Sequence, residues 1–151
     1  MRPSDRYRTW SKSRAPRLAE TAYLLGHPVH LTLSTFRRVP FFLNSGLACR
    51  VMDLVVREAD TMAACLMPDH LHWLVLPSEI LGGLVGRFKL SSLEVAWELG
   101  VKGKLWQRSF YDHVVRGEED LARTLRYIAE NPVEEGLVDS AEKWPYQFRR
   151  R

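Results

Sequence analysis

Cysteine is scarce in this chain, and long hydrophobic runs are absent. The two cysteines, Cys49 and Cys65, form no Cys-x-x-Cys pair, so the sequence indicates neither a disulfide framework nor a thiolate zinc site. No stretch reaches the ~18 apolar residues that a membrane span requires, and residues 1–20 contain no apolar core of signal-peptide type. These absences predict a cytoplasmic protein with no membrane partner.

Acidic residues are outnumbered by basic ones, 18 to 22, and the excess lies mainly at the two ends of the chain. Residues 1–20 are basic and show no hydrophobic periodicity, which predicts a flexible arm, and residues 147–151 are predicted to be a basic tail. The length of 151 residues suits a single domain that begins after the arm. Basic ends favour a polyanionic partner such as nucleic acid, although they also keep a protein in solution.

Hydrophobic periodicity predicts an α+β domain. The pattern indicates strands over residues 29–36, 62–67, 70–77 and part of 105–115, and helices over residues 44–59, 78–99 and 118–131. The last helix is expected to end near Asn131, because Pro132 disfavours helical geometry in the residue before it. This order is typical of a ferredoxin-like (RRM-like) antiparallel sheet with helices packed on one face, in which the first and third strands are central.

A histidine pair lies at the start of the third predicted strand. His70 and His72 are two residues apart, and alternation along a strand places both imidazoles on the same face of the sheet. Two neutral imidazole nitrogens on a rigid strand form half of a site for a divalent metal ion. The pair alone is a weak signal, because a structural role is as common for a buried histidine.

The last predicted helix carries a second set of polar residues. Its apolar residues form one stripe: Leu121, Ala122, Leu125, Ile128 and Ala129. At ~100° per residue, Tyr127 projects roughly opposite the centre of that stripe, and Asn131 lies one turn further along the same side. If this side packs over the histidine strand, a phenol, an amide oxygen and two imidazoles meet. A divalent ion there would polarise a phosphodiester and let the phenol act as nucleophile.

Four segments together resemble the REP-associated tyrosine transposases, which are single-tyrosine HUH transposases. The similar segments are residues 67–72 (MPDHLH), 105–113 (LWQRSFYDH), 127–138 (YIAENPVEEGLV) and 144–146 (WPY), within a resemblance that runs from about residue 21 to 146. Asp69 stands where relatives often have another polar residue, which we expect to be harmless. The arm at residues 1–20 lacks a clear family motif.

The resemblance implies a metal-dependent endonuclease and strand transferase for single-stranded DNA. Carried over by position, it makes Tyr127 the nucleophile and makes His70, His72 and Asn131 ligands of Mg²⁺ or Mn²⁺. Family members cleave beside imperfect palindromic hairpins, leaving a 5′-phosphotyrosine and a free 3′-hydroxyl. The resemblance also implies a prokaryotic protein that associates with the nucleoid when bound to DNA, as a monomer or a homodimer.

Basic and aromatic side chains are candidates for contacting DNA, one of them in the arm and the others in the domain. They are Trp10, for stacking on an unpaired base, and Arg37, Arg38, Arg87, Lys89, Lys102, Lys104, Arg108, His113 and Arg116, for contacts to phosphates or bases. His113 could instead pack or form a backbone hydrogen bond. The lysines and arginines could instead be ordinary solvated surface residues.

Other functions compete with DNA cleavage. Histidine-triad hydrolases need a third alternating histidine, and Leu74 occupies that position. Two-histidine phosphoesterases need paired motifs with Thr or Ser; His30-Leu31-Thr32 has that form, but residues 70–72 do not supply its mate. A non-catalytic nucleic-acid-binding module on the same fold, and a domesticated transposase that serves its host, both stay open.

Overall fold

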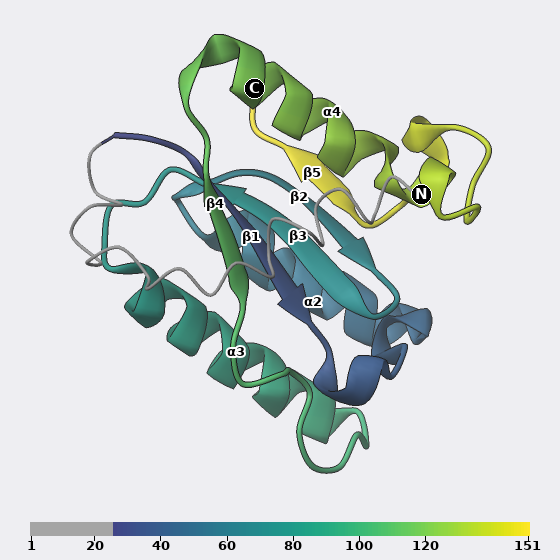
Figure 1. The fold of residues 1–151 in the computed structure, drawn as a ribbon. Coiled ribbons are helices and arrows are strands. Elements are labelled where there is room, and N and C mark those ends of the chain that lie inside the picture. Colours follow the sequence, from purple (N-terminus) through teal and green to yellow (C-terminus); the bar gives the residue numbers. More distant parts are fainter. Residues whose placement is uncertain (1–25) are drawn as a thin grey trace.

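The structure is a computed structural model that describes residues 26–151 (Figure 1). The predicted arm at residues 1–20, with Trp10, lies outside the described residues. The strands are β1 (Val29–Ser34), β2 (Thr61–Met67), β3 (His70–Val75), β4 (Tyr111–Val114) and β5 (Gln147–Arg149). The α-helices are α2 (Ser45–Arg57), α3 (Leu81–Glu98) and α4 (Gly117–Glu134), and short 3-10 turns are η2 (Phe36–Arg38), η3 (Phe41–Leu43) and η4 (Ala141–Lys143).

The five strands form one antiparallel sheet in the order β4-β1-β3-β2-β5, with β3 at its centre. The α+β class with an antiparallel sheet is therefore confirmed, and so is the central position of the histidine strand. Thr32 of β1 lies opposite His72 of β3, and His30 of β1 lies opposite His113 of β4. These registers place the histidines of three neighbouring strands close together.

The helices are divided between the two faces of the sheet, which differs from the expected packing on one face (Figure 1). α2 and α3 cover one face, where Leu31, Leu33 and Trp73 form the main core with them. α4 covers the other face, packing Ile128 against a smaller cluster that includes Cys65.

Two chain segments near the C-terminus differ from the sequence-based expectation. α4 does not end at Asn131 but continues to Glu134, with Pro132 inside its last turn. Proline removes one intrahelical hydrogen bond, and the turn is closed by the N–H groups of Glu135 and Leu137, which donate to Asn131 and Pro132. The expected tail at residues 147–151 contains strand β5, and the Arg150 guanidinium donates to the Thr61 carbonyl oxygen at 2.8 Å.

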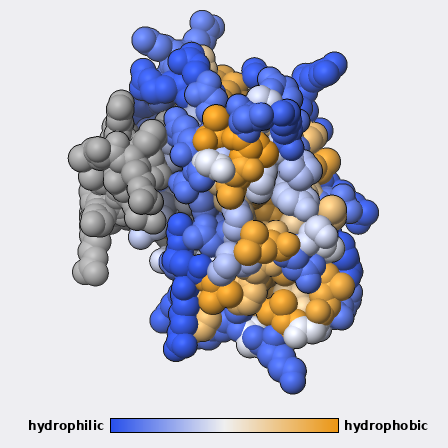
Figure 2. Space-filling model, turned by 90° about the vertical axis from the view of Figure 1, so that its right-hand side faces the viewer, coloured by the Kyte–Doolittle hydropathy of each residue, from blue (hydrophilic) through white to orange (hydrophobic). Residues whose placement is uncertain are grey.

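The surface carries large apolar side chains at scattered points, among them Leu43, Leu90 and Trp97. Figure 2 shows one face of the molecule, where hydrophobic patches are separated by hydrophilic side chains. Within residues 26–151, no helix is both long enough and apolar enough to pass through a lipid bilayer.

Candidate active site on the histidine face

A row of histidines crosses the sheet face that lies under α4. His30, His70 and His72 are buried, with 3%, 8% and 3% of their surface exposed. His113 continues the row on β4, directly opposite His30. Strand alternation explains the row, because the residues between these histidines, such as Leu31 and Leu71, point into the core on the other face. The pairing of three strands thus gathers imidazoles that are up to 83 positions apart by number.

Short contacts connect three of these imidazoles to one carboxylate. His70 Nδ1 lies 2.7 Å from Asp69 Oδ1, and His70 Nε2 lies 3.2 Å from His72 Nε2. His72 Nδ1 lies 3.1 Å from His30 Nε2 and 3.5 Å from Thr32 Oγ1. The other carboxylate oxygen of Asp69 forms an ion pair with Arg38 Nε at 3.1 Å. Both Nε2 atoms of the histidine pair therefore face one point.

Burial keeps the middle of this row uncharged. It lowers the pKa of His30 to about 3; electrostatic interactions with His113 and His70 add to the effect, and the interaction with Asp120 opposes it. Burial, followed by electrostatic interactions with His70, His30 and Arg38, also lowers the pKa of His72 well below its usual value. Neutral imidazoles are the form that binds metal ions.

Asp69 remains ionised beside the row. Burial alone would raise the pKa of its carboxyl group, but the hydrogen bond to His70 and the charges of His70 and Arg38 outweigh burial and lower the pKa. The ionised Asp69 carboxylate accepts a hydrogen bond from His70 Nδ1–H. A neutral His70 then has its lone pair at Nε2.

α4 lays its own polar residues over the histidine row. Near its start, Asp120 Oδ2 lies 3.3 Å from His113 Nε2 and also accepts the N–H of Arg116 at 3.0 Å, which caps the helix. The Tyr127 ring meets the His72 ring edge to face at a centroid distance of 5.2 Å, and the His30 ring at 6.0 Å. The expected proximity of Tyr127 to the histidine strand is therefore present.

The buried side of α4 follows the expected apolar stripe only in part: Leu121, Leu125 and Ile128 pack against the smaller cluster. Ala122 is exposed, whereas Thr124, Ile128 and Asn131 are buried, and Tyr127 is half-buried against the histidines. The sheet face beneath α4 combines the apolar side chains of the smaller cluster with the histidine row. Matching polar residues on both elements avoids burying imidazoles against an apolar surface.

Two buried oxygens on this side of α4 have no hydrogen-bond partner. They are Oδ1 of Asn131, whose residue is 1% exposed, and Oγ1 of Thr124, which is fully buried. An unpaired buried oxygen costs roughly 1–3 kcal/mol and is rare unless a ligand completes it. Asn131 follows Tyr127 by one helical turn, so its amide oxygen is on the side of α4 that faces the histidine row.

These donors fit a divalent metal ion. The two Nε2 atoms at 3.2 Å match the spacing of neighbouring ligands around one ion, which is about 3 Å for metal–nitrogen bonds of ~2.1 Å. Within residues 26–151, no three His, Cys, Asp or Glu side chains are grouped so that they could hold a metal ion. Asn131 is outside these residue types, and its orphaned amide oxygen is of a kind that Mg²⁺ and Mn²⁺ accept.

Some of the predicted DNA contacts gather beside this site. Arg37 and Lys104 both lie over the Phe36 ring, at 5.1 and 5.4 Å from its centroid. Arg38 follows directly and joins Ser34 to Asp69. Arg37 and Arg38 have φ angles of 55° and 58°, a left-handed conformation that costs non-glycine residues energy and is concentrated at functional sites. We call Arg37, Arg38 and Lys104 the basic corner.

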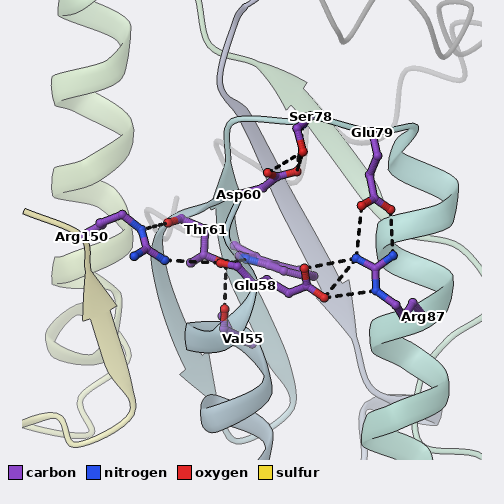
Figure 3. A network of polar contacts seen from close by, with 9 residues as sticks. Val55, Glu58, Asp60, Thr61, Ser78, Glu79, Arg87 and Arg150 are labelled. Atoms are coloured by element: carbon purple, nitrogen blue, oxygen red, sulfur yellow. Dashed lines mark hydrogen bonds and ion pairs between the residues drawn. The ribbon is translucent and has the colours of Figure 1, made fainter.

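Other predicted DNA contacts are engaged elsewhere. Figure 3 shows the Arg87 guanidinium held between Glu58 and Glu79, with distances of 3.1 and 2.8 Å, on the face covered by α2 and α3. These hydrogen bonds raise the pKa of Arg87 above its ordinary value. Lys89 donates to the backbone oxygens of Gln107 and Arg108. The structure therefore does not bring Arg87 to the histidine row, and Lys89 supports the loop before β4.

The remaining candidates for DNA contact do not gather at one site. Lys102 lies in the loop after α3, Arg108 in the loop before β4, and Arg116 precedes α4. His113 faces Asp120 in the histidine row. Trp10 lies outside the described residues.

Three polar residues of the site were not assigned a role from the sequence: His30, Asp69 and Asp120. The signal for His30 was present, because His30-Leu31-Thr32 alternates like residues 70–72 and antiparallel pairing of these two strands was expected. Asp69 was treated as harmless, although its position next to His70 allows a carboxylate to reach the imidazole. Asp120 was assigned no role at the site, and its contact with His113 depends on the tertiary packing of α4.

Sequence comparisons confirm the resemblance to the REP-associated tyrosine transposases. The chain is 31% identical over 105 residues to a Haemophilus influenzae protein assigned to that family, covering 61% of this chain and 60% of the relative. It is 27% identical over 95 residues to a REP-associated tyrosine transposase of Escherichia coli K12, covering 63% of this chain and 57% of the relative. No protein-family profile matches the chain.

A structural comparison supports the fold. A REP-associated tyrosine transposase solved bound to a REP hairpin superimposes with a TM-score of 0.62 at 23% identity, covering 81% of this chain and 76% of that one. The similarity shows that the sheet and helices share one architecture. The region matched in sequence spans only about 60% of the length of the curated relatives.

Proposed function

Because this chain is related in sequence to the REP-associated tyrosine transposases, we propose that it is a metal-dependent single-stranded DNA endonuclease and strand transferase. Tyr127 is the nucleophile, and His70, His72 and Asn131 hold Mg²⁺ or Mn²⁺. The observation that carries the proposal is the meeting of Tyr127 with the histidine row, since the phenol ring lies 5.2 Å from the His72 ring although 55 positions separate them.

The residues divide the reaction between them. The Tyr127 oxygen loses its proton and bonds to the phosphorus of a phosphodiester, while the bond from phosphorus to the 3′ oxygen breaks and that oxygen leaves as a hydroxyl. The result is a 5′-phosphotyrosine and a free 3′-hydroxyl. When bound, the divalent ion supplies a positive charge that stabilises the phosphorane and the departing oxygen. Attack by another 3′-hydroxyl on the phosphotyrosine reverses these bonds and rejoins DNA.

The substrate in this proposal is DNA with a hairpin next to an unpaired strand. The solved relative is bound to a REP hairpin, and that ligand is carried to this chain as part of the proposal. The basic corner lies beside Asp69 and His70, so a strand held there by its phosphates would reach the site. Such a protein works in the prokaryotic cytoplasm, on the nucleoid, as a monomer or a homodimer.

The test is a covalent-adduct assay. The full chain is incubated with labelled hairpin oligonucleotides taken from its genomic surroundings, with Mg²⁺ or Mn²⁺, and analysed by denaturing electrophoresis. We expect a slow-moving protein–DNA band that chelator removes. Tyr127→Phe should abolish the band and leave DNA binding nearly unchanged, because only the nucleophilic oxygen is lost. A band that survives Tyr127→Phe contradicts the assignment.

A non-catalytic DNA-binding protein on the same fold, which includes a domesticated relative that has lost cleavage, is the second candidate. It is favoured by the basic corner, which is sufficient to hold a phosphate backbone without any chemistry. This candidate predicts hairpin binding that does not depend on divalent ions and no covalent band. A mobile element and a domesticated protein that retains cleavage share the same site.

A further inference from the structure

We propose that Asp69 and His30 are positioning residues that decide which nitrogens His70 and His72 present to the metal ion. This inference rests on the proposed function, since it concerns the same metal site. Neither residue is a ligand. Asp69 contacts Nδ1 of His70, and His30 contacts Nδ1 of His72. Both Nε2 atoms of the pair are thereby directed to one point.

Asp69 fixes the tautomer of His70. Asp69 Oδ1 accepts a hydrogen bond from His70 Nδ1 at 2.7 Å, so a neutral His70 must have its lone pair at Nε2. A carboxylate behind a ligating histidine also orients the ring and makes the ligand more basic. His70 is thereby committed to metal binding before any ion arrives.

The Asp69 carboxylate is itself held in place. Its second oxygen pairs with Arg38, which in turn donates to Ser34 Oγ at 2.9 Å. The Asp69 backbone oxygen accepts both the N–H and the hydroxyl of Thr35, at 3.0 and 3.1 Å. The turn between β2 and β3 is therefore clamped to the end of β1. A carboxylate at the tip of an unsupported turn would hold His70 in one tautomer less firmly.

His30 plays the corresponding part for His72, but through an exchange of protons. With the His70 Nε2 lone pair directed at it, His72 Nε2 must carry the proton in the metal-free protein, and His72 Nδ1 then accepts from His30 Nε2. A metal ion needs the lone pair of His72 Nε2. The His30 Nε2 proton passes to His72 Nδ1, the His72 Nε2 proton leaves to solvent, and His30 takes up a proton from solvent at Nδ1. Both rings stay neutral, and His30 Nε2 becomes the acceptor at the same 3.1 Å contact.

This exchange explains why an imidazole occupies position 30. A ring with one donor and one acceptor nitrogen serves both states of His72 without moving, whereas a hydroxyl at 3.5 Å, that of Thr32, is at the limit of hydrogen bonding. His30 is buried and also packs on the Tyr127 ring, so its position is fixed from both sides.

The first test reads the tautomers directly, without DNA. Long-range ¹H–¹⁵N spectra of the full chain with labelled histidine, recorded in chelator, should show His70 protonated at Nδ1 and His72 at Nε2. Titration with Mg²⁺, which is diamagnetic, should move the His72 proton to Nδ1. Asp69→Ala should shift the His70 proton toward Nε2. An unchanged His70 tautomer in Asp69→Ala, or Mg²⁺ binding without the His72 change, overturns the proposal.

The second test measures Mn²⁺ affinity by calorimetry, again without DNA. Asp69→Ala and His30→Phe should weaken binding by about 10- to 100-fold, because the outer partner of a ligand is lost. Asp69→Asn and His30→Gln keep an acceptor oxygen and should stay within a few fold of the wild type. Thr32→Val is the matched control and should bind as the wild type does. Equal affinity in folded His30→Phe, or an equal loss in Thr32→Val, contradicts the role of His30.

The two proposals fail in different ways. A wild-type chain that binds neither Mn²⁺ nor Mg²⁺ refutes the metal site and the positioning together. A wild-type chain that binds Mn²⁺ and forms the covalent band, with variants of normal affinity and unchanged tautomers, refutes only the positioning. If His30→Phe does not fold, the Mg²⁺ titration of the wild type still decides the question.

Discussion

Replacing Asn131 by Leu should stabilise the metal-free protein and abolish its response to metal. Leu has the same branched shape as Asn, so the replacement removes the amide without opening a large cavity. Asn131 Oδ1 is buried and has no partner, and such an oxygen costs roughly 1–3 kcal/mol. We therefore expect the free energy of unfolding of Asn131→Leu to rise by about 1–2 kcal/mol in chelator.

The assay is urea unfolding with and without Mn²⁺. At a Mn²⁺ concentration of 100 times its dissociation constant, the wild type should gain about 2.7 kcal/mol, since ligand binding to the folded state alone stabilises it. Asn131→Leu should gain far less. Thr124→Val is the matched control, because Thr124 Oγ1 is also buried without a partner on the same helix. It should gain stability in chelator and keep the full Mn²⁺ response.

Two results would refute this reasoning. A loss of stability in chelator for Asn131→Leu would mean that the amide is bonded in the folded protein and is not held open for a ligand. A full Mn²⁺ response in Asn131→Leu would remove Asn131 from the metal site.

Two further predictions concern charge. In chelator, stability should be greatest above pH 6.5 and fall as the pH drops from 6.5 toward 3, because the unfolded chain protonates His30 and His72 while burial lowers their pKa in the folded protein. His30 contributes up to about 5 kcal/mol to this loss, and His72 adds to it; urea unfolding at a series of pH values measures the total, and a flat profile would contradict the buried neutral histidines. Arg37→Ala and Lys104→Ala should each reduce the slope of log affinity against log salt by about 0.7 for single-stranded DNA, in electrophoretic titrations. Arg87→Ala should leave that slope unchanged, and an equal change there would argue against the basic corner.

Much of the fold could be predicted from periodicity. The strand that carries His70 and His72, and the helix that Asn44 caps, were expected within a few residues, because alternation and capping are local signals. β5 was missed because it has only three residues and runs directly into the arginines that end the sequence, which resemble a tail. Pro132 was overestimated as a helix stop, since a proline in the last turn removes only one hydrogen bond.

The site was predictable in part. Tyr127, His70 and His72 were expected to meet, and the structure brings Tyr127 to His72. The burial of Thr124 and Asn131 was not predictable from the helix alone, because its apolar stripe gives no information about the histidine row on the sheet face that it meets. The contacts of Asp69 and His30 depend on strand register and on the turn clamped by Thr35, and these are tertiary features.

The central claim is that Tyr127 becomes joined to DNA at a metal site formed by the histidine strand. Mass spectrometry of protein incubated with a hairpin oligonucleotide and Mg²⁺, after digestion with nuclease and protease, tests it most directly. We predict a nucleotide attached through its 5′-phosphate to Tyr127. A nucleotide on Tyr111 or Tyr146 instead, or no modified peptide from protein that binds both Mg²⁺ and the hairpin, would contradict the account.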